Sequence, residues 1–134
     1  MLNKKDVKIL VVDDESYIRE VVRQALENAD FEVEEAGDGA TALSMLRQYP
    51  YNVIITDLRM PGLTGESILE EAISLFPETV VIIMTGFGSI QSAVEAIRKG
   101  AYDYLLKPFE LAELVMRVEK GLEERQLKSE NRLL

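Results

Sequence analysis

Short apolar runs alternate with amphipathic segments along this chain. The runs are residues 8–12, 31–35, 52–56, 80–84 and 102–106. Three of them are almost entirely apolar, which is typical of strands that are buried on both faces of a parallel sheet. No internal repeat, low-complexity tract or mid-chain linker interrupts the sequence. The pattern therefore predicts five strands, each followed by a helix.

The segments between the runs have apolar residues spaced i, i+3, i+4, i+7, as on one face of a helix. This spacing predicts helices over residues 18–29, 40–47, 68–76, 90–97 and 111–122. Ser16 and Ser89 are expected to be N-cap residues, and Gly100 is expected to follow the 90–97 helix as its C′ residue.

Alternating strand–helix units form a parallel sheet with helices on both faces, joined by right-handed crossovers. We therefore predict an α/β fold of the flavodoxin-like (βα)5 type, with a doubly wound parallel sheet in the strand order 2-1-3-4-5. In such a sheet, ligands bind beyond the carboxyl ends of the strands. The residues at those ends are the candidates for a functional site.

Composition narrows the chemistry available to such a fold. The chain has 134 residues, a formal net charge of −9, and neither cysteine nor histidine. These absences exclude disulfides, thiol catalysis, histidine triads and histidine-ligated metals. The negative charge argues against direct nucleic acid binding by this segment. Its longest apolar stretches fall far short of the roughly 20 residues that span a membrane, so we expect a cytoplasmic protein.

Acidic, hydroxyl and basic residues follow four of the predicted strands. Asp13 and Asp14 follow the first, Asp57 the third, Thr85 the fourth and Lys107 the fifth. Strands one and three are neighbours in the predicted order, so the three carboxylates should converge and raise one another's pKa. A Mg²⁺ ion, which prefers oxygen ligands, would relieve this repulsion. Together with Lys107 it would bring the formal charge of the site to zero.

Each of these residues has a simpler explanation when it is taken alone. An acidic pair after a strand commonly caps a helix, and a strand-end aspartate or a Lys-Pro pair is commonly a turn. Their joint occurrence at four strand ends favours one shared site.

The sequence around these residues resembles the four signatures of response-regulator receiver domains. The matching segments are Val11-Val12-Asp13-Asp14-Glu15, Thr56-Asp57-Leu58-Arg59-Met60-Pro61-Gly62, Met84-Thr85-Gly86 and Lys107-Pro108-Phe109. The resemblance covers about residues 6–124. Residues 85–89 and 93–104 are similar, more narrowly, to receivers of nitrogen-regulator-type activators that work with sigma-54 RNA polymerase. The resemblance implies a signalling switch of a two-component system that catalyses only its own phosphotransfer and slow dephosphorylation, and is not otherwise an enzyme.

By this resemblance, Asp57 accepts a phosphoryl group from a phosphohistidine of a sensor histidine kinase. Asp14, Asp57 and the backbone carbonyl of Arg59 are implied to bind Mg²⁺ directly, and Asp13 is implied to act through water. Lys107 is implied to pair with a phosphoryl oxygen.

The resemblance also implies how the signal spreads. Thr85 would hydrogen-bond the phosphoryl group, Tyr104 would be an aromatic switch that turns inward, and the Lys107–Pro108 bond would be cis. The surface of the fourth helix, fifth strand and fifth helix would change. The alternative for Tyr104 is a half-buried aromatic residue of a strand, with no role in switching.

The end of the chain is expected to lead out of the domain. Residues 1–124 should form the receiver domain, and residues 125–134 should begin a helical linker that continues the fifth helix. Leu127, Asn131 and Leu134 have the spacing of heptad positions d, a and d. In sigma-54 activators such a linker joins a dimeric receiver to an ATPase domain and a DNA-binding domain. We therefore predict a homodimer through the fourth and fifth helices and the extension; a solvated, fraying tail is the alternative.

Three other classes of protein share parts of the pattern. A haloacid-dehalogenase-type phosphatase has Asp-x-Asp at the end of strand one, whereas the residue two after Asp57 is Arg59. An FMN-binding flavodoxin needs a phosphate loop rich in Gly, Ser and Thr after strand one, where Asp13 and Asp14 would repel a phosphate. A structural adaptor with an inactive pocket is disfavoured by the intact set of strand-end residues.

Overall fold

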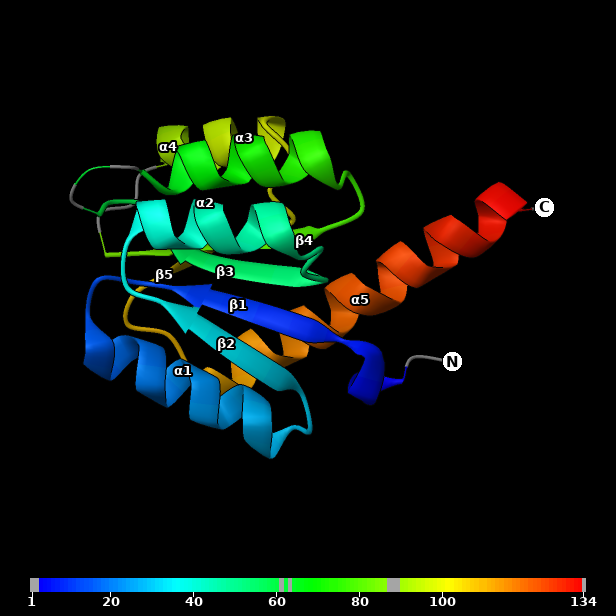
Figure 1. Cartoon of the computed structure of the whole chain (residues 1–134), viewed down its shortest axis with the longest axis horizontal. Helices are drawn as coiled ribbons and strands as arrows, with labels where there is room; N and C mark the ends of the chain where they lie inside the picture. Colours follow the sequence, from blue (N-terminus) through cyan, green and yellow to red (C-terminus); the bar gives the residue numbers. More distant parts are fainter. Residues whose placement is uncertain (1–2, 61, 63, 87–89, 134) are drawn as a thin grey trace.

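Strands and helices alternate along the chain, as Figure 1 shows for the computed structural model. The structure describes residues 3–60, 62, 64–86 and 90–133, and the side chains of these residues up to 126. The strands are β1 (Lys8–Val12), β2 (Glu32–Ala36), β3 (Val53–Asp57), β4 (Val80–Thr85) and β5 (Asp103–Leu106). The helices are α1 (Ser16–Asn28), α2 (Gly39–Gln48), α3 (Gly65–Leu75), α4 (Ile90–Arg98) and α5 (Leu111–Leu133), and a 3-10 turn, η1 (Lys4–Asp6), precedes β1.

The strands form one parallel sheet in the order β2-β1-β3-β4-β5, which confirms the predicted flavodoxin-like topology. Val12 at the end of β1 pairs with Thr56, and Asp57 at the end of β3 pairs with Met84 on β4. Because the strands all run in the same direction, their carboxyl ends meet at one edge of the sheet.

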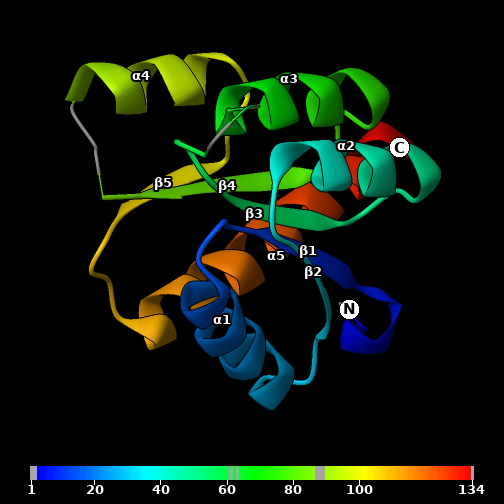
Figure 2. The ribbon, with the colours of Figure 1, turned by 60° about the vertical axis from the view of Figure 1, so that its left-hand side comes forward.

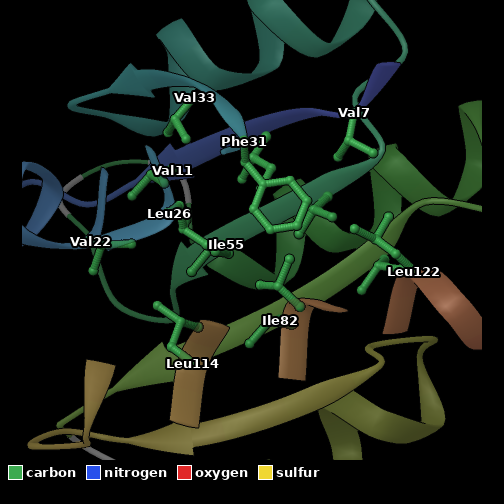
Figure 3. Packing of buried hydrophobic residues seen from close by; sticks show 14 of the residues in the cluster. Val7, Val11, Val22, Leu26, Phe31, Val33, Ile55, Ile82, Leu114 and Leu122 are labelled. Carbon is green, nitrogen blue, oxygen red and sulfur yellow. The ribbon is translucent and has the colours of Figure 1, made fainter. Parts of the chain in front are cut away.

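Helices cover both faces of this sheet, α1 and α5 on one side and α2, α3 and α4 on the other (Figures 1 and 2). Successive residues of a strand point to opposite faces. Ile9 and Val11 therefore belong to one core, and Leu10 and Val12 belong to the other. Figure 3 shows the first core, in which buried side chains of α1 and α5 meet the sheet, among them Val22, Leu26, Leu114 and Leu122.

The predicted caps have different outcomes. Ser16 is the first residue of α1 rather than its N-cap, which is Glu15, so that prediction is wrong. Asp13 Oδ1 accepts a hydrogen bond from the Glu15 N–H at 2.9 Å, so an aspartate holds the loop before α1. Ser89 lies outside the described residues. Gly100, with a φ of +113°, follows α4 as predicted.

The predicted strands begin and end within one residue of the observed ones, and the helices differ more at their ends. α3 begins at Gly65, three residues before the predicted start, and α5 continues as one helix to Leu133. None of the described helices combines the length and the hydropathy that a membrane span requires.

Candidate functional site

Three aspartates lie together at the carboxyl edge of the sheet. Asp57 is the last residue of β3, Asp13 and Asp14 follow β1, and one carboxylate oxygen of each lies within 4.8 Å of the others. Asp13 is fully buried and Asp57 is 7% exposed, whereas Asp14 is exposed. Two carboxylates are thus withdrawn from water, and the third faces solvent.

The ammonium group of Lys107 contacts two of these carboxylates. Lys107 Nζ donates to Asp13 Oδ2 at 2.8 Å and to Asp57 Oδ2 at 3.3 Å. The Lys107 N–H donates to the carbonyl oxygen of Thr85 at 2.8 Å, which joins the ends of β4 and β5. Thr85 is fully buried, and the Lys107–Pro108 peptide bond is cis, as expected. The structure therefore brings residues from four strand ends to one edge.

Burial and charge act in opposite directions on this cluster. Burial raises the pKa of Asp57 above its usual value and outweighs the Lys107 ammonium, which lowers it, while Asp13 raises it further. For Lys107, burial lowers the pKa, but the hydrogen bond to Asp13 and the charges of both aspartates outweigh burial and raise the pKa. Lys107 is therefore a cation at neutral pH, yet it does not compensate the acids fully.

The arrangement fits a hard divalent cation. Three carboxylates and one ammonium leave a formal charge of −2, which Mg²⁺ would neutralise. Asp13 already accepts hydrogen bonds on both oxygens, from the Glu15 N–H and from Lys107 Nζ. The carboxylate of Asp14 is exposed and open to a ligand. This difference favours Asp14 over Asp13 for direct coordination.

The backbone around Asp57 is packed closely against α3. The Gly65 N–H donates to the carbonyl oxygen of Leu58 at 2.9 Å, and a Cβ on Gly65 would lie 2.2 Å from the carbonyl oxygen of Asp57. On the other side, the Arg59 N–H donates to Asp57 Oδ1 at 3.3 Å. The loop after β3 therefore holds both the main chain and the carboxylate of Asp57.

Tyr104 connects β5 to α4. Its side chain is half-buried in the core under α2, α3 and α4, and its Oη lies 2.8 Å from Ser92 Oγ on α4. Thr85 pairs with Leu106 across β4 and β5, so Tyr104 lies on the strand next to Thr85. Sequence analysis singled out Tyr104 but not its partner Ser92, because no motif in the sequence indicates which residue the Tyr104 hydroxyl contacts.

Sequence analysis also missed Arg19 of α1. Its Nη1 donates to the backbone carbonyl of Asp13 at 2.6 Å, and its Nε donates to Glu35 Oε1 on β2 at 3.2 Å. The available signal was an arginine on the helix after the acidic pair together with an acid on the neighbouring strand. That signal indicates an ion pair, and nothing in it points to a bond with a main-chain carbonyl.

Comparison with known proteins identifies the family. The response regulator receiver domain model matches residues 9–119. The regulatory protein AtoC of Escherichia coli (strain K12) is 39% identical over 127 residues, which are 95% of this chain and 28% of AtoC. The chain thus spans about a quarter of the length of the curated relatives it matches.

Solved structures agree in fold and in sequence. A receiver domain from Clostridium thermocellum is 35% identical with a TM-score of 0.85, covering 90% of this chain and 98% of that one. The beryllofluoride-activated NtrC4 receiver domain dimer, determined in solution, is 33% identical with a TM-score of 0.83, covering 88% of this chain and 98% of that one. The chain therefore belongs to the response regulator receiver domain family.

Proposed function

We propose that this chain is the phosphorylatable switch of a two-component response regulator, with Asp57 as its phosphoacceptor. The observation that carries the proposal is the position of Asp57, a largely buried carboxylate between the Asp13–Asp14 pair and the Lys107 ammonium. Receiver domains are signalling domains, and the phosphodonor we propose is a sensor histidine kinase.

In the proposed transfer, a carboxylate oxygen of Asp57 attacks the phosphorus of a phosphohistidine on the kinase. A P–O bond forms as the P–N bond breaks, and the electron pair of the broken bond stays on the imidazole nitrogen, which takes up a proton. The charge on the equatorial phosphoryl oxygens must be compensated. Lys107 already lies 3.3 Å from Asp57 Oδ2 and can pair with one of these oxygens.

The proposed cofactor is Mg²⁺, which supplies positive charge to the phosphoryl oxygens when it is bound. Asp14, Asp57 and the backbone carbonyl of Arg59 would hold it directly, and Asp13 would contact it through water. The two hydrogen bonds that Asp13 already accepts support this division of roles.

Phosphorylation would then alter the side of the sheet that ends in β5. An acyl phosphate replaces one negative charge with about two and adds acceptor oxygens that need donors. The Thr85 hydroxyl would move toward the new oxygens, and Tyr104 would turn inward and leave Ser92. The surface of α4, β5 and α5 would change as a result.

We infer that the output of this switch is control of a transcription activator. Residues 1–124 would be the receiver and residues 125–134 the start of the linker, since α5 continues to Leu133. The relatives are activators of the sigma-54 type, so an ATPase and a DNA-binding domain are the proposed partners along the chain. A homodimer is proposed by analogy with the NtrC4 receiver dimer. The interface that we propose for it consists of α4, α5 and the extension of α5.

The test is the intact mass of the protein after incubation with acetyl phosphate and Mg²⁺. One added phosphoryl group is expected for the natural chain, and none for Asp57→Asn or in the presence of EDTA. Asp14→Ala should weaken labelling more than Asp13→Ala, because only Asp14 is proposed to contact the ion directly. Labelling of Asp57→Asn at the natural rate would rule out the assignment of the phosphoacceptor.

A further inference from the structure

The loop that carries Asp13 and Asp14 is held from outside the acidic cluster by Arg19. We propose that Arg19 is a positioning residue for the cation site. Its guanidinium fixes the main chain of Asp13 and thereby orients the Asp14 carboxylate, which would bind the ion directly, and the Asp13 carboxylate, which would act through water. This inference rests on the proposed function, since it assigns a role in the same site.

The contacts of Arg19 show how it acts on the loop. Its Nη1 donates to the Asp13 carbonyl oxygen at 2.6 Å, and the Asp13 N–H donates to the carbonyl oxygen of Ala36 at 3.2 Å. Both main-chain polar groups of Asp13 are therefore engaged, one by α1 and the other by β2. A hydrogen bond from a charged donor is roughly twice as strong as a neutral one, so Arg19 supplies the stronger of these two restraints.

The guanidinium is itself held in place. Its Nε donates to Glu35 Oε1 at 3.2 Å, and only 20% of the Arg19 side chain is exposed. A Cβ built on Gly37 would lie 3.1 Å from Arg19 Nη1, closer than side chains normally tolerate. The Gly37 backbone therefore provides the space in which the guanidinium lies against the Asp13 carbonyl.

This geometry suits an acidic loop that must keep its carboxylates available. Asp13 and Asp14 repel each other and Asp57, so without a cation the loop is under electrostatic stress. Arg19 brings a positive charge to the main chain without taking a carboxylate oxygen of the cluster. The exposed Asp14 thus stays open to the ion while the loop that carries it is fixed.

A merely structural ion pair would have a different signature, and Arg23 provides the comparison. One helical turn beyond Arg19, Arg23 donates through Nε to Glu35 Oε2 at 2.6 Å and through Nη1 to Glu27 at 2.8 Å. It shares Glu35 with Arg19, but it bonds to the carboxylates of Glu35 and Glu27 rather than to the Asp13 carbonyl. Arg23→Gln is therefore a matched control that weakens the same bridge between α1 and β2.

The experiment is calorimetric titration of Mg²⁺ into the unphosphorylated chain and its variants. Arg19→Gln should raise the Kd for Mg²⁺ by about tenfold, the lower end of the effect known for residues that orient metal ligands. Arg23→Gln should change the Kd by less than about twofold. Gly37→Ala should also weaken Mg²⁺ binding, because its methyl group displaces the guanidinium. In an Arg19→Gln background it should cause no further loss of Mg²⁺ affinity, because the guanidinium is already absent.

Each outcome decides a separate point. Equal Mg²⁺ affinity in the natural chain and Arg19→Gln would overturn the inference, and so would equal losses in Arg19→Gln and Arg23→Gln. Urea unfolding in EDTA shows whether Arg19→Gln is folded. If it is not, the same test is made by comparing the Mg²⁺ affinities of Gly37→Ala and Arg23→Gln. A natural chain that binds no Mg²⁺ would instead contradict the proposed function, and this inference with it.

Discussion

At the scale of single residues, the site depends on how closely the main chain of Asp57 can approach α3. A Cβ on Gly65 would lie 2.2 Å from the Asp57 carbonyl oxygen and 2.9 Å from Leu58 Cα, and both of these are backbone atoms that cannot rotate away. Gly65→Ala should therefore displace the end of β3 or the start of α3. We expect a loss of about 1–3 kcal/mol in the free energy of unfolding, measured with urea.

Gly86→Ala is the matched control for this prediction. A Cβ on Gly86 would meet no heavy atom within 4 Å among the described residues. Its substitution should change the free energy of unfolding by less than about 0.5 kcal/mol. Similar losses of unfolding free energy in the two variants would mean that the reduced backbone freedom of alanine, rather than the contact with Asp57, makes Gly65→Ala destabilising.

A second effect at the residue scale concerns Tyr102, just before β5. Its hydroxyl donates to Glu124 Oε2 on α5 at 2.8 Å. Burial, followed by the hydrogen bond and the charge of Glu124, raises the pKa of Tyr102 to about 12 from an ordinary value of 10.0. Because the folded state favours the neutral phenol, this contribution to stability is complete below pH 10 and is lost as the pH rises toward about 12.

Ultraviolet titration of the phenols should detect this group. Comparison of the natural chain with Tyr102→Phe isolates the ionisation of Tyr102. Glu124→Gln should lower the pKa of Tyr102, because the hydrogen-bonded carboxylate loses its charge. The stability difference between the natural chain and Tyr102→Phe should shrink between about pH 10 and pH 12. A Tyr102 pKa unchanged in Glu124→Gln would show that the bond to α5 does not form in solution.

At the scale of elements, α4 differs from its neighbour α3 in how it is packed. α3 buries four residues, Gly65, Ile68, Leu69 and Ala72, whereas Ala96 is the buried residue of the described α4. The Tyr104–Ser92 hydrogen bond links β5 to α4. We predict faster amide hydrogen exchange in α4 than in α3 of the unphosphorylated chain, because local opening follows the amount of buried contact.

Removing this hydrogen bond should increase the difference in amide exchange rate between α4 and α3. Ser92→Ala and Tyr104→Phe each delete one partner of the hydrogen bond, so both should speed exchange in α4 while leaving α3 unchanged. Exchange in α4 as slow as in α3, or unaffected by both substitutions, would mean that α4 is held by contacts other than this one.

Much of this architecture follows from the sequence, because apolar periodicity is a local property and strand ends in a parallel sheet share one edge. Asp57 and Lys107 could be placed together in this way, although 50 positions separate them. The contact of Arg19 with the Asp13 carbonyl could not be predicted, since main-chain acceptors are the same at every position. Ser16 was placed wrongly as a cap because Asp13 holds the loop instead.

At the scale of the whole molecule, exposed apolar side chains occur on α4, β5 and α5. Figure 2 shows α4 and α5 on opposite sides of the sheet that ends in β5. Ile90 is 87% exposed, and the other members of this set are about half exposed: Val94, Ile97, Leu106 and Met116. We propose this exposed apolar set as the surface through which the chain dimerises. A symmetric dimer would bury each of these side chains twice, once for each copy.

The last prediction therefore concerns assembly, measured by sedimentation equilibrium with and without beryllofluoride as a phosphoryl mimic. Val94→Ser with Ile97→Ser should weaken the dimer by about tenfold or more, because each lost apolar contact counts twice. Tyr17→Ser removes a side chain that is 71% exposed on α1, a helix outside the proposed interface, and should leave the dimer unchanged.

Truncation after Gln126 tests the extension of α5 separately. It keeps Glu124, which bonds to Tyr102, and removes residues 127–134, most of the segment proposed as the linker. If the linker contributes heptad contacts, this truncation should weaken the dimer independently of the α4 substitutions, so that the two losses add in free energy. If the full-length and truncated chains are equally monomeric across micromolar concentrations, activated or not, residues 127–134 are a tail rather than a dimer helix, and the surface on α4 must serve another partner.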